Sequence, residues 1–234
     1  MIARRLNSVQ EYYFSKKLRE VAAMVAEGKP VINMGIGSPD LPAHPAVLGA
    51  LKDSFDHPKL HQYQSYQGLH ELRKAIADFY KKYYNHAADP NSEILPLMGS
   101  KEGIMLISMA FLNAGDKVLI PNPGYPTYQS VTKLVEAEPV FYDLKSYNNW
   151  QPDLEELNQM DTSGVKLMWI NYPNMPTGAN AQLSTFENLI SWAKGKGILL
   201  VNDNPYSFIL TDQPQSILSV KGATEVAMEL NSLS

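Results

Sequence analysis

From Gly99 onward, short apolar runs alternate with segments that have helical periodicity. Runs rich in Val, Ile and Leu, separated by helices, are typical of a parallel sheet whose two faces are both covered. The sequence therefore predicts an α/β fold, a mostly parallel sheet sandwiched by helices. The predicted strands are 117–120, 139–144, 165–171, 198–202 and 226–230, and the predicted helices are 101–112, 127–136 and 183–196.

The N-terminal part of the chain lacks this alternation. Helical patterns cover residues 9–27, 44–55 and 69–84, and the Gly and Pro content of residues 35–42 indicates a loop. We expect residues 1–63 to form an N-terminal arm and part of a small domain. Residues 64–234 are expected to form a large domain that continues past the given end.

Composition narrows the classes of function. The chain has 234 residues, no cysteine and a net charge of −4, so it has no disulfides or thiolate metal ligands and lacks the basic excess of a nucleic-acid-binding protein. We expect no metal site. No apolar run approaches the about 18 residues of a membrane span, and residues 1–6 do not resemble a secretory signal. We therefore expect a soluble cytoplasmic protein with no membrane or nucleic-acid partner.

Polar residues follow two of the predicted strands, where ligands of open α/β sheets bind. Residues 171–178 (Asn-Tyr-Pro-Asn-Met-Pro-Thr-Gly) form a turn, and Asp203 and Tyr206 follow the run 199–202. A carboxylate after a buried strand needs a partner, and Asp203 could pair with a protonated ring nitrogen. The alternatives are a helix cap, a solvated strand end or a ribose-binding acid. The last lacks a Gly-x-Gly-x-x-Gly motif. Tyr206 is a hydrogen-bond donor to a ligand or a half-buried core residue.

Two further segments could contact a ligand. Residues 99–103 (Gly-Ser-Lys-Glu-Gly) open a helix, so their N–H groups form either an anion site or an ordinary N-cap by Ser100 with Glu102 in the first turn. Residues 121–126 form a rigid turn holding Tyr125 after a strand. Its ring either stacks on a planar cofactor or packs on a neighbour.

The order and spacing of these segments resemble the class I/II aminotransferases, which are pyridoxal-phosphate (PLP) enzymes of fold type I. The resemblance runs from about Gly35 to Ser234. It implies that Asp203 pairs with the cofactor's ring nitrogen, that Tyr206 binds the ring hydroxyl and that Tyr125 stacks on the ring. It further implies a phosphate site at Ser100, Lys101 and Ser232, joined by Tyr63 from the partner subunit of a homodimer, and a substrate carboxylate lying against Gly37.

One residue departs from the family pattern. The position before Pro-Thr-Gly is usually an asparagine that also binds the ring hydroxyl, and here it is Met175, whose thioether cannot donate a hydrogen bond. The resemblance then leaves Tyr206 as the main donor, with Asn174 as a possible substitute for the missing amide.

The given sequence ends at Ser234. In the family a Ser-x-Ser tail like residues 232–234 precedes the lysine that holds PLP as a Schiff base. Two explanations stay open. Either the polypeptide continues through a lysine already joined to PLP, which we favour, or it is a true fragment.

The activity that the resemblance implies is transfer of an amino group between an L-amino acid and a 2-oxo acid. A PLP-dependent lyase of the C–S lyase type on the same fold is the first alternative. A non-catalytic domain that senses PLP or an amino acid is the second, and a nucleotide-binding α/β domain is the third.

Overall fold

The computed structural model describes residues 2–9, 11–35, 37, 39–209 and 211–232. The chain divides into two compact units. One comprises Met1–Val9 together with Gln67–Ser234, and the other comprises Gln10–Tyr66.

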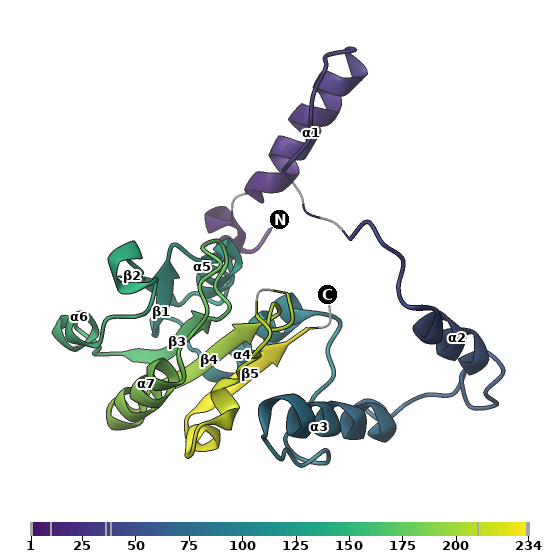
Figure 1. The fold of residues 1–234 in the computed structure, drawn as a ribbon. Helices are drawn as coiled ribbons and strands as arrows, with labels where there is room; N and C mark the ends of the chain where they lie inside the picture. Colours follow the sequence, from purple (N-terminus) through teal and green to yellow (C-terminus); the bar gives the residue numbers. More distant parts are fainter. Residues whose placement is uncertain (1, 10, 36, 38, 210, 233–234) are drawn as a thin grey trace. The chain divides into compact units, whose positions relative to one another are not determined.

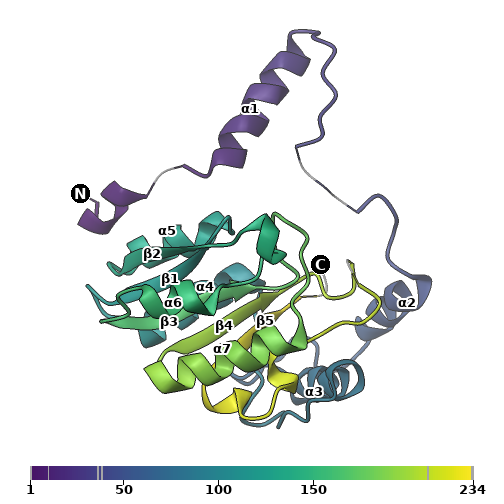
Figure 2. The same cartoon turned by 60° about the vertical axis from the view of Figure 1, so that its left-hand side comes forward.

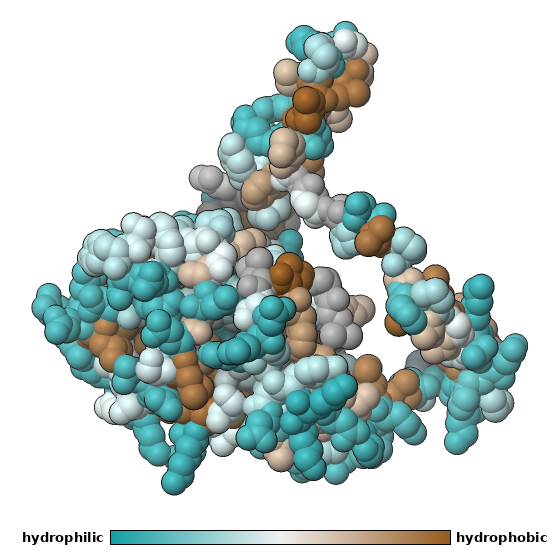
Figure 3. Space-filling model, viewed as in Figure 1, coloured by the Kyte–Doolittle hydropathy of each residue, from teal (hydrophilic) through white to brown (hydrophobic). Residues whose placement is uncertain are grey.

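The Gln10–Tyr66 unit contains two helices, α1 (Tyr13–Ala26) and α2 (Pro45–Ser54). Both were predicted, with slightly longer bounds. Helix α2 begins at Pro45, and the ring of His44 accepts the N–H of Ala46 at 3.2 Å. Neither helix has a buried residue, so apolar side chains are exposed on both, as the brown atoms of α1 at the top of Figure 3 show.

The larger unit is built on a sheet of five parallel strands in the order β2-β1-β3-β4-β5 (Figure 1). All five strands were predicted. Their bounds are β1 (Lys117–Asn122), β2 (Glu138–Asp143), β3 (Val165–Asn171), β4 (Leu199–Asn204) and β5 (Ala227–Asn231).

Helices cover both faces of this sheet, as predicted (Figure 2). Side chains of β3 alternate between the faces: Leu167 and Trp169 pack with the residues of α4 and α5, and Met168 and Ile170 pack with those of α6 and α7. The helices are α3 (His70–Tyr84), α4 (Ser100–Phe111), α5 (Pro126–Leu134), α6 (Leu154–Gln159) and α7 (Leu183–Lys196). Short 3-10 helices are η1 (Arg4–Ser8), η2 (Ser146–Asn148), η3 (Ile217–Ser219) and η4 (Ala223–Glu225).

Helix α6 was not predicted. Its six residues give too short a pattern to show helical periodicity. The local signal is Asp153, whose Oδ1 accepts the N–H groups of Glu155 and Glu156 and so caps the helix.

Strand β4 is longer than predicted, and this corrects the position of Asp203. The apolar run ends at Val201, but the ladder continues through Asn204, so Asp203 lies inside the strand and not beyond its end. Asp203 is level with Asn171 of β3 and Leu230 of β5. The three carboxyl ends therefore lie side by side.

Among the helices of the described residues, none is long and apolar enough to cross a bilayer.

Candidate functional site

Asp203 is a buried acid at the edge of the sheet that is formed by the carboxyl ends of β3, β4 and β5. Its residue is 4% exposed, and Oδ2 accepts a hydrogen bond from the Tyr128 hydroxyl at 2.7 Å. Oδ1 is buried and receives no hydrogen bond from any described residue. Burial raises the pKa of Asp203 to about 6, and the bond from Tyr128 acts in the opposite direction. Asp203 is therefore neither a helix cap nor a solvated strand end.

Tyr128 is a residue of this site that the sequence analysis missed. It lies on α5 with its ring fully buried, and it stacks on Trp169 of β3 with centroids 5.1 Å apart and planes 7° apart. Burial keeps its pKa well above the usual value, so the hydroxyl stays protonated and donates to Asp203. The available signal was spacing, because Tyr128 stands three residues after Tyr125, which is about one helical turn.

Tyr125 precedes the first residue of α5, at the carboxyl end of β1. Its ring meets that of Tyr128 edge-on, with centroids 5.6 Å apart, and the ammonium nitrogen of Lys101 lies 5.9 Å from its centroid. These contacts bring Lys101, Tyr125 and Asp203 into one connected group.

The turn after β3 is tied to β4 through Asn171. Its side-chain Nδ2 donates to the carbonyl of Asp203 at 2.6 Å, and its Oδ1 accepts the N–H of Met175 at 2.8 Å. Asn174 is buried, and its Oδ1 accepts the Thr177 hydroxyl at 2.7 Å. Its Nδ2 is buried with no acceptor among the described residues. This amide could donate to a ligand, as the predicted role of Asn174 requires.

Tyr206 lies in the loop after β4 and is half-buried. Its hydroxyl is 3.9 Å from the sulfur of Met175. The turn after β3 and the loop after β4 are therefore in contact through Met175 and Tyr206. A thioether is a weak acceptor, so this contact leaves the phenol able to donate elsewhere.

The N-terminus of α4 differs from one expectation. Gly99, not Ser100, is the N-cap, with φ 121° and no side-chain cap, so the N-cap interpretation of Ser100 was wrong. Glu102 is in the first turn as expected, and its Oε2 accepts the N–H of Met98 at 2.7 Å. A glycine with positive φ holds the chain in a conformation that other residues adopt at a cost.

Close packing brings this helix end to the end of β5. A Cβ added to Gly103 would lie 2.5 Å from Cδ2 of Leu230, so a larger residue here would require the Leu230 side chain to shift. Ser100 lies one turn before Gly103, and Ser232 lies two residues after Leu230. Unpaired N–H groups and the helix dipole attract anions at such a helix start, which supports the predicted phosphate site.

Gly37 and Tyr63 belong to the Gln10–Tyr66 unit. Both are exposed, and the Tyr63 side chain is fully so at 107%. Their predicted contacts with the substrate and with the partner subunit's cofactor stay predictions.

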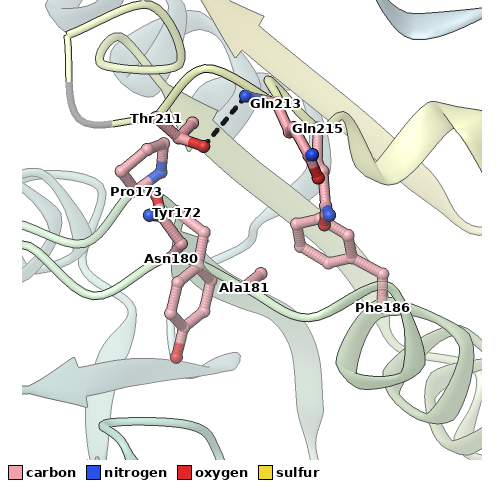
Figure 4. Close-up of a pocket in the computed structure, with 8 residues that line it drawn as sticks. All are labelled: Tyr172, Pro173, Asn180, Ala181, Phe186, Thr211, Gln213 and Gln215. Atoms are coloured by element: carbon pink, nitrogen blue, oxygen red, sulfur yellow. Dashed lines mark hydrogen bonds between the residues drawn. The ribbon is translucent and has the colours of Figure 1, made fainter.

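A small cavity of about 90 Å³ lies on the face of the sheet that α7 covers, opposite the face of Tyr128. Figure 4 shows Tyr172 and Pro173, Phe186 of α7 and Gln215 of the loop after β4 around it. Cofactor and substrate pockets have volumes of roughly 300–1,000 Å³. The cavity is therefore too small for PLP, and none of the predicted site residues lines it.

The fold and this edge define a class of protein: an α/β domain whose strands end at residues that could hold a planar, anionic cofactor. The sequence matches the family "Aminotransferase class I and II" over residues 29–234. The chain belongs to this family, whose members are PLP-dependent enzymes.

Named relatives agree with the family. The chain is 41% identical over 232 residues to LL-diaminopimelate aminotransferase of Aquifex aeolicus and 40% identical over 235 residues to that of Dehalococcoides mccartyi, matching 98% and 100% of this chain. Among solved structures, apo-BacF from Bacillus subtilis is 34% identical, with a TM-score of 0.93 over the whole chain. The chain spans about 60% of the length of these proteins.

The residues present fit PLP. The free Oδ1 of Asp203 is a buried acceptor that suits the N–H of a protonated pyridine ring, and Tyr125 offers an aromatic face nearby. The start of α4 suits a phosphate. Each predicted ligand of the larger unit thus lies at one edge of the sheet.

Because the pKa of Asp203 is raised, the free energy of unfolding of the protein without cofactor should depend on pH. The acid is neutral and stabilising below its ordinary pKa of 3.8, and this stability is lost as the pH rises through about 6. The side chain of Asp203→Asn stays neutral at every pH. The free energy of unfolding of the Asp203→Asn apoprotein, taken relative to wild type, should therefore be about 2–3 kcal/mol larger at pH 7.5 than at pH 4.

Denaturant unfolding of the two apoproteins at both pH values measures this gain. Asp212→Asn, at an exposed position of the following loop, is the control and should show none. An equal difference between Asp203→Asn and wild type at the two pH values would show that Asp203 has an ordinary pKa.

Proposed function

We propose that this chain is part of a PLP-dependent aminotransferase that transfers the amino group of an L-amino acid to a 2-oxo acid. The observation that carries the proposal is the buried carboxylate of Asp203, bonded by Tyr128 on one oxygen and without a donor on the other. When bound, PLP supplies an electron sink that stabilises negative charge at the substrate Cα.

Each residue then has a physical task. Asp203 accepts the ring N–H and keeps the proton there, while Tyr128 holds the carboxylate in place. Tyr206 donates to the ring hydroxyl, with Asn174 able to add a second donor where Met175 cannot. Tyr125 covers the ring, and Ser100, Lys101 and Ser232 bind the phosphate. A Schiff-base lysine, which the family resemblance implies, would hold the cofactor and move the proton at Cα.

The remaining assignments extend the proposal to the assembled protein. We assign residues 1–63 to an N-terminal arm and part of a small domain, with Gly37 against the substrate carboxylate. A homodimer, in which Tyr63 reaches the phosphate of the partner subunit's cofactor, and a cytoplasmic location complete it. The relatives that are named LL-diaminopimelate aminotransferases make LL-diaminopimelate the first amino donor to test.

Product analysis of the protein at its full natural length, loaded with PLP, tests the activity. With LL-diaminopimelate or another L-amino acid and a 2-oxo acid, we expect the acceptor to be converted to its amino acid. Ammonia and a 2-oxo acid formed without any acceptor would instead identify a lyase. PLP binding with neither reaction would favour a sensing domain.

A further inference from the structure

Glu229 of β5 is a half-buried residue whose carboxylate has no part in the proposed chemistry. Its Oε2 accepts Nδ2 of Asn202 at 2.9 Å and the backbone N–H of Ile217 at 3.1 Å. Its Oε1 accepts the hydroxyl of Tyr80, on α3, at 3.0 Å, and the side chain of Ser216 bonds to the Glu229 carboxylate as well. Four donors from three segments therefore converge on one carboxyl group.

Such convergence specifies a carboxylate. Two carboxylate oxygens can accept all four bonds, whereas the amide of a glutamine has one acceptor oxygen and would turn an N–H₂ group toward a donor. Burial raises the pKa of Glu229, and the bonds from Asn202, Ser216, Tyr80 and Ile217 oppose that shift. Leaving one of these buried donors unpaired would cost about 1–3 kcal/mol.

One bond leads to the turn after β3. The amide of Asn202 donates to Glu229 with its nitrogen and accepts the N–H of Tyr172 at 3.1 Å with its oxygen. The orientation of this amide is set by Glu229, since a carboxylate can only accept. Tyr172 is the residue from which the chain enters the turn that carries Asn174 and Met175.

A second bond leads to the loop after β4. The N–H of Ile217 holds the end of this loop on Glu229. Two residues earlier, the carbonyl of Gln215 accepts Nδ2 of Asn204 at 3.1 Å, and Asn204 in turn accepts the hydroxyl of Ser207, the residue after Tyr206. Both loops that flank Asp203 are thus tied to the same carboxylate.

We propose that Glu229 is a positioning residue that holds the 171–178 turn and the Tyr206 loop in place around the cofactor ring. Glu229 does not touch the ring; it acts through Asn202 and Ile217. This inference rests on the proposed function, because the group that the two loops surround is PLP.

The test is the binding of PLP alone to the apoprotein at its full natural length. Affinity is followed by titration, the geometry of the bound ring by its visible circular dichroism, and stability by thermal unfolding. We expect Glu229→Gln to weaken PLP binding about tenfold, by analogy with the loss of an outer-shell partner at metal sites, and to change the dichroism per bound cofactor. Glu225→Gln, at an exposed glutamate four residues earlier, should match wild type.

Two further variants separate positioning from simple stability. Asn202→Ala breaks the link to Tyr172 and should change the dichroism as Glu229→Gln does, and it decides the question if Glu229→Gln does not fold. Tyr80→Phe removes the bond to Oε1 of Glu229 and the hydroxyl's interaction with Asn231 but leaves the bonds to Asn202 and Ile217, so it should lower the unfolding temperature and leave the dichroism unchanged.

Two results would overturn the inference. One is wild-type affinity and dichroism in Glu229→Gln or, where that variant does not fold, in Asn202→Ala. The other is an equal change in Tyr80→Phe, which would show that the spectrum follows stability alone. A wild-type protein that binds no PLP would instead contradict the proposed function itself.

Discussion

Asp203→Asn, made in the protein at its full natural length, is expected to lower kcat/KM for transamination about 100- to 1,000-fold, the range seen when one preorganised electrostatic partner is removed from an active site. The side chain keeps its size, and its oxygen can still accept the Tyr128 hydroxyl. It loses the negative charge that keeps the ring nitrogen protonated, so the ring withdraws electrons less strongly.

Steady-state kinetics with a saturating 2-oxo acid measure this loss, and Asp212→Asn is the matched control. The same Asp203→Asn substitution should stabilise the apoprotein at neutral pH, because the bond from Tyr128 offsets only part of the cost of burying the carboxylate. Activity within threefold of wild type would show that Asp203 is not the partner of the ring.

Trp169→Ala is expected to have the largest effect on stability, a loss of about 3–5 kcal/mol, as for other buried aromatic side chains truncated to alanine. Trp169 is fully buried in the middle of β3, stacked on Tyr128. The cavity would form between the sheet and α5, where the rigid strand and helix backbones can close it only in part.

Denaturant unfolding of the apoprotein gives the free energy. Phe141→Ala is the control, because it truncates another strand aromatic that is 45% exposed, on the outermost strand β2. Its loss should be well under half that of Trp169→Ala. Equal losses would mean that Trp169 is not packed as described.

The sheet could be predicted because its strands are continuous apolar runs, which a strand buried on both faces requires. The same rule placed Asp203 one residue outside its strand. The apolar run ends at Val201, whereas the strand continues through three polar residues. Asn202, Asp203 and Asn204 stay in the ladder because β3 and β5 on either side provide their backbone partners.

The site residues were predicted from local turns and from a family resemblance. Both signals are contained in single short segments of the sequence. The bonds of Tyr128 to Asp203 and of Asn202 to Glu229 join residues 75 and 27 positions apart. Such pairs depend on strand register and on which face each side chain occupies. A sequence without aligned relatives does not show these.

Intact mass of the protein at its full natural length, purified with PLP and treated with borohydride, tests the central claim most directly. We expect a mass increased by one reduced PLP per chain, attached to a lysine. A protein that carries no PLP after reduction, although it is folded and was supplied with the cofactor, would contradict the assignment of this edge of the sheet as a PLP site.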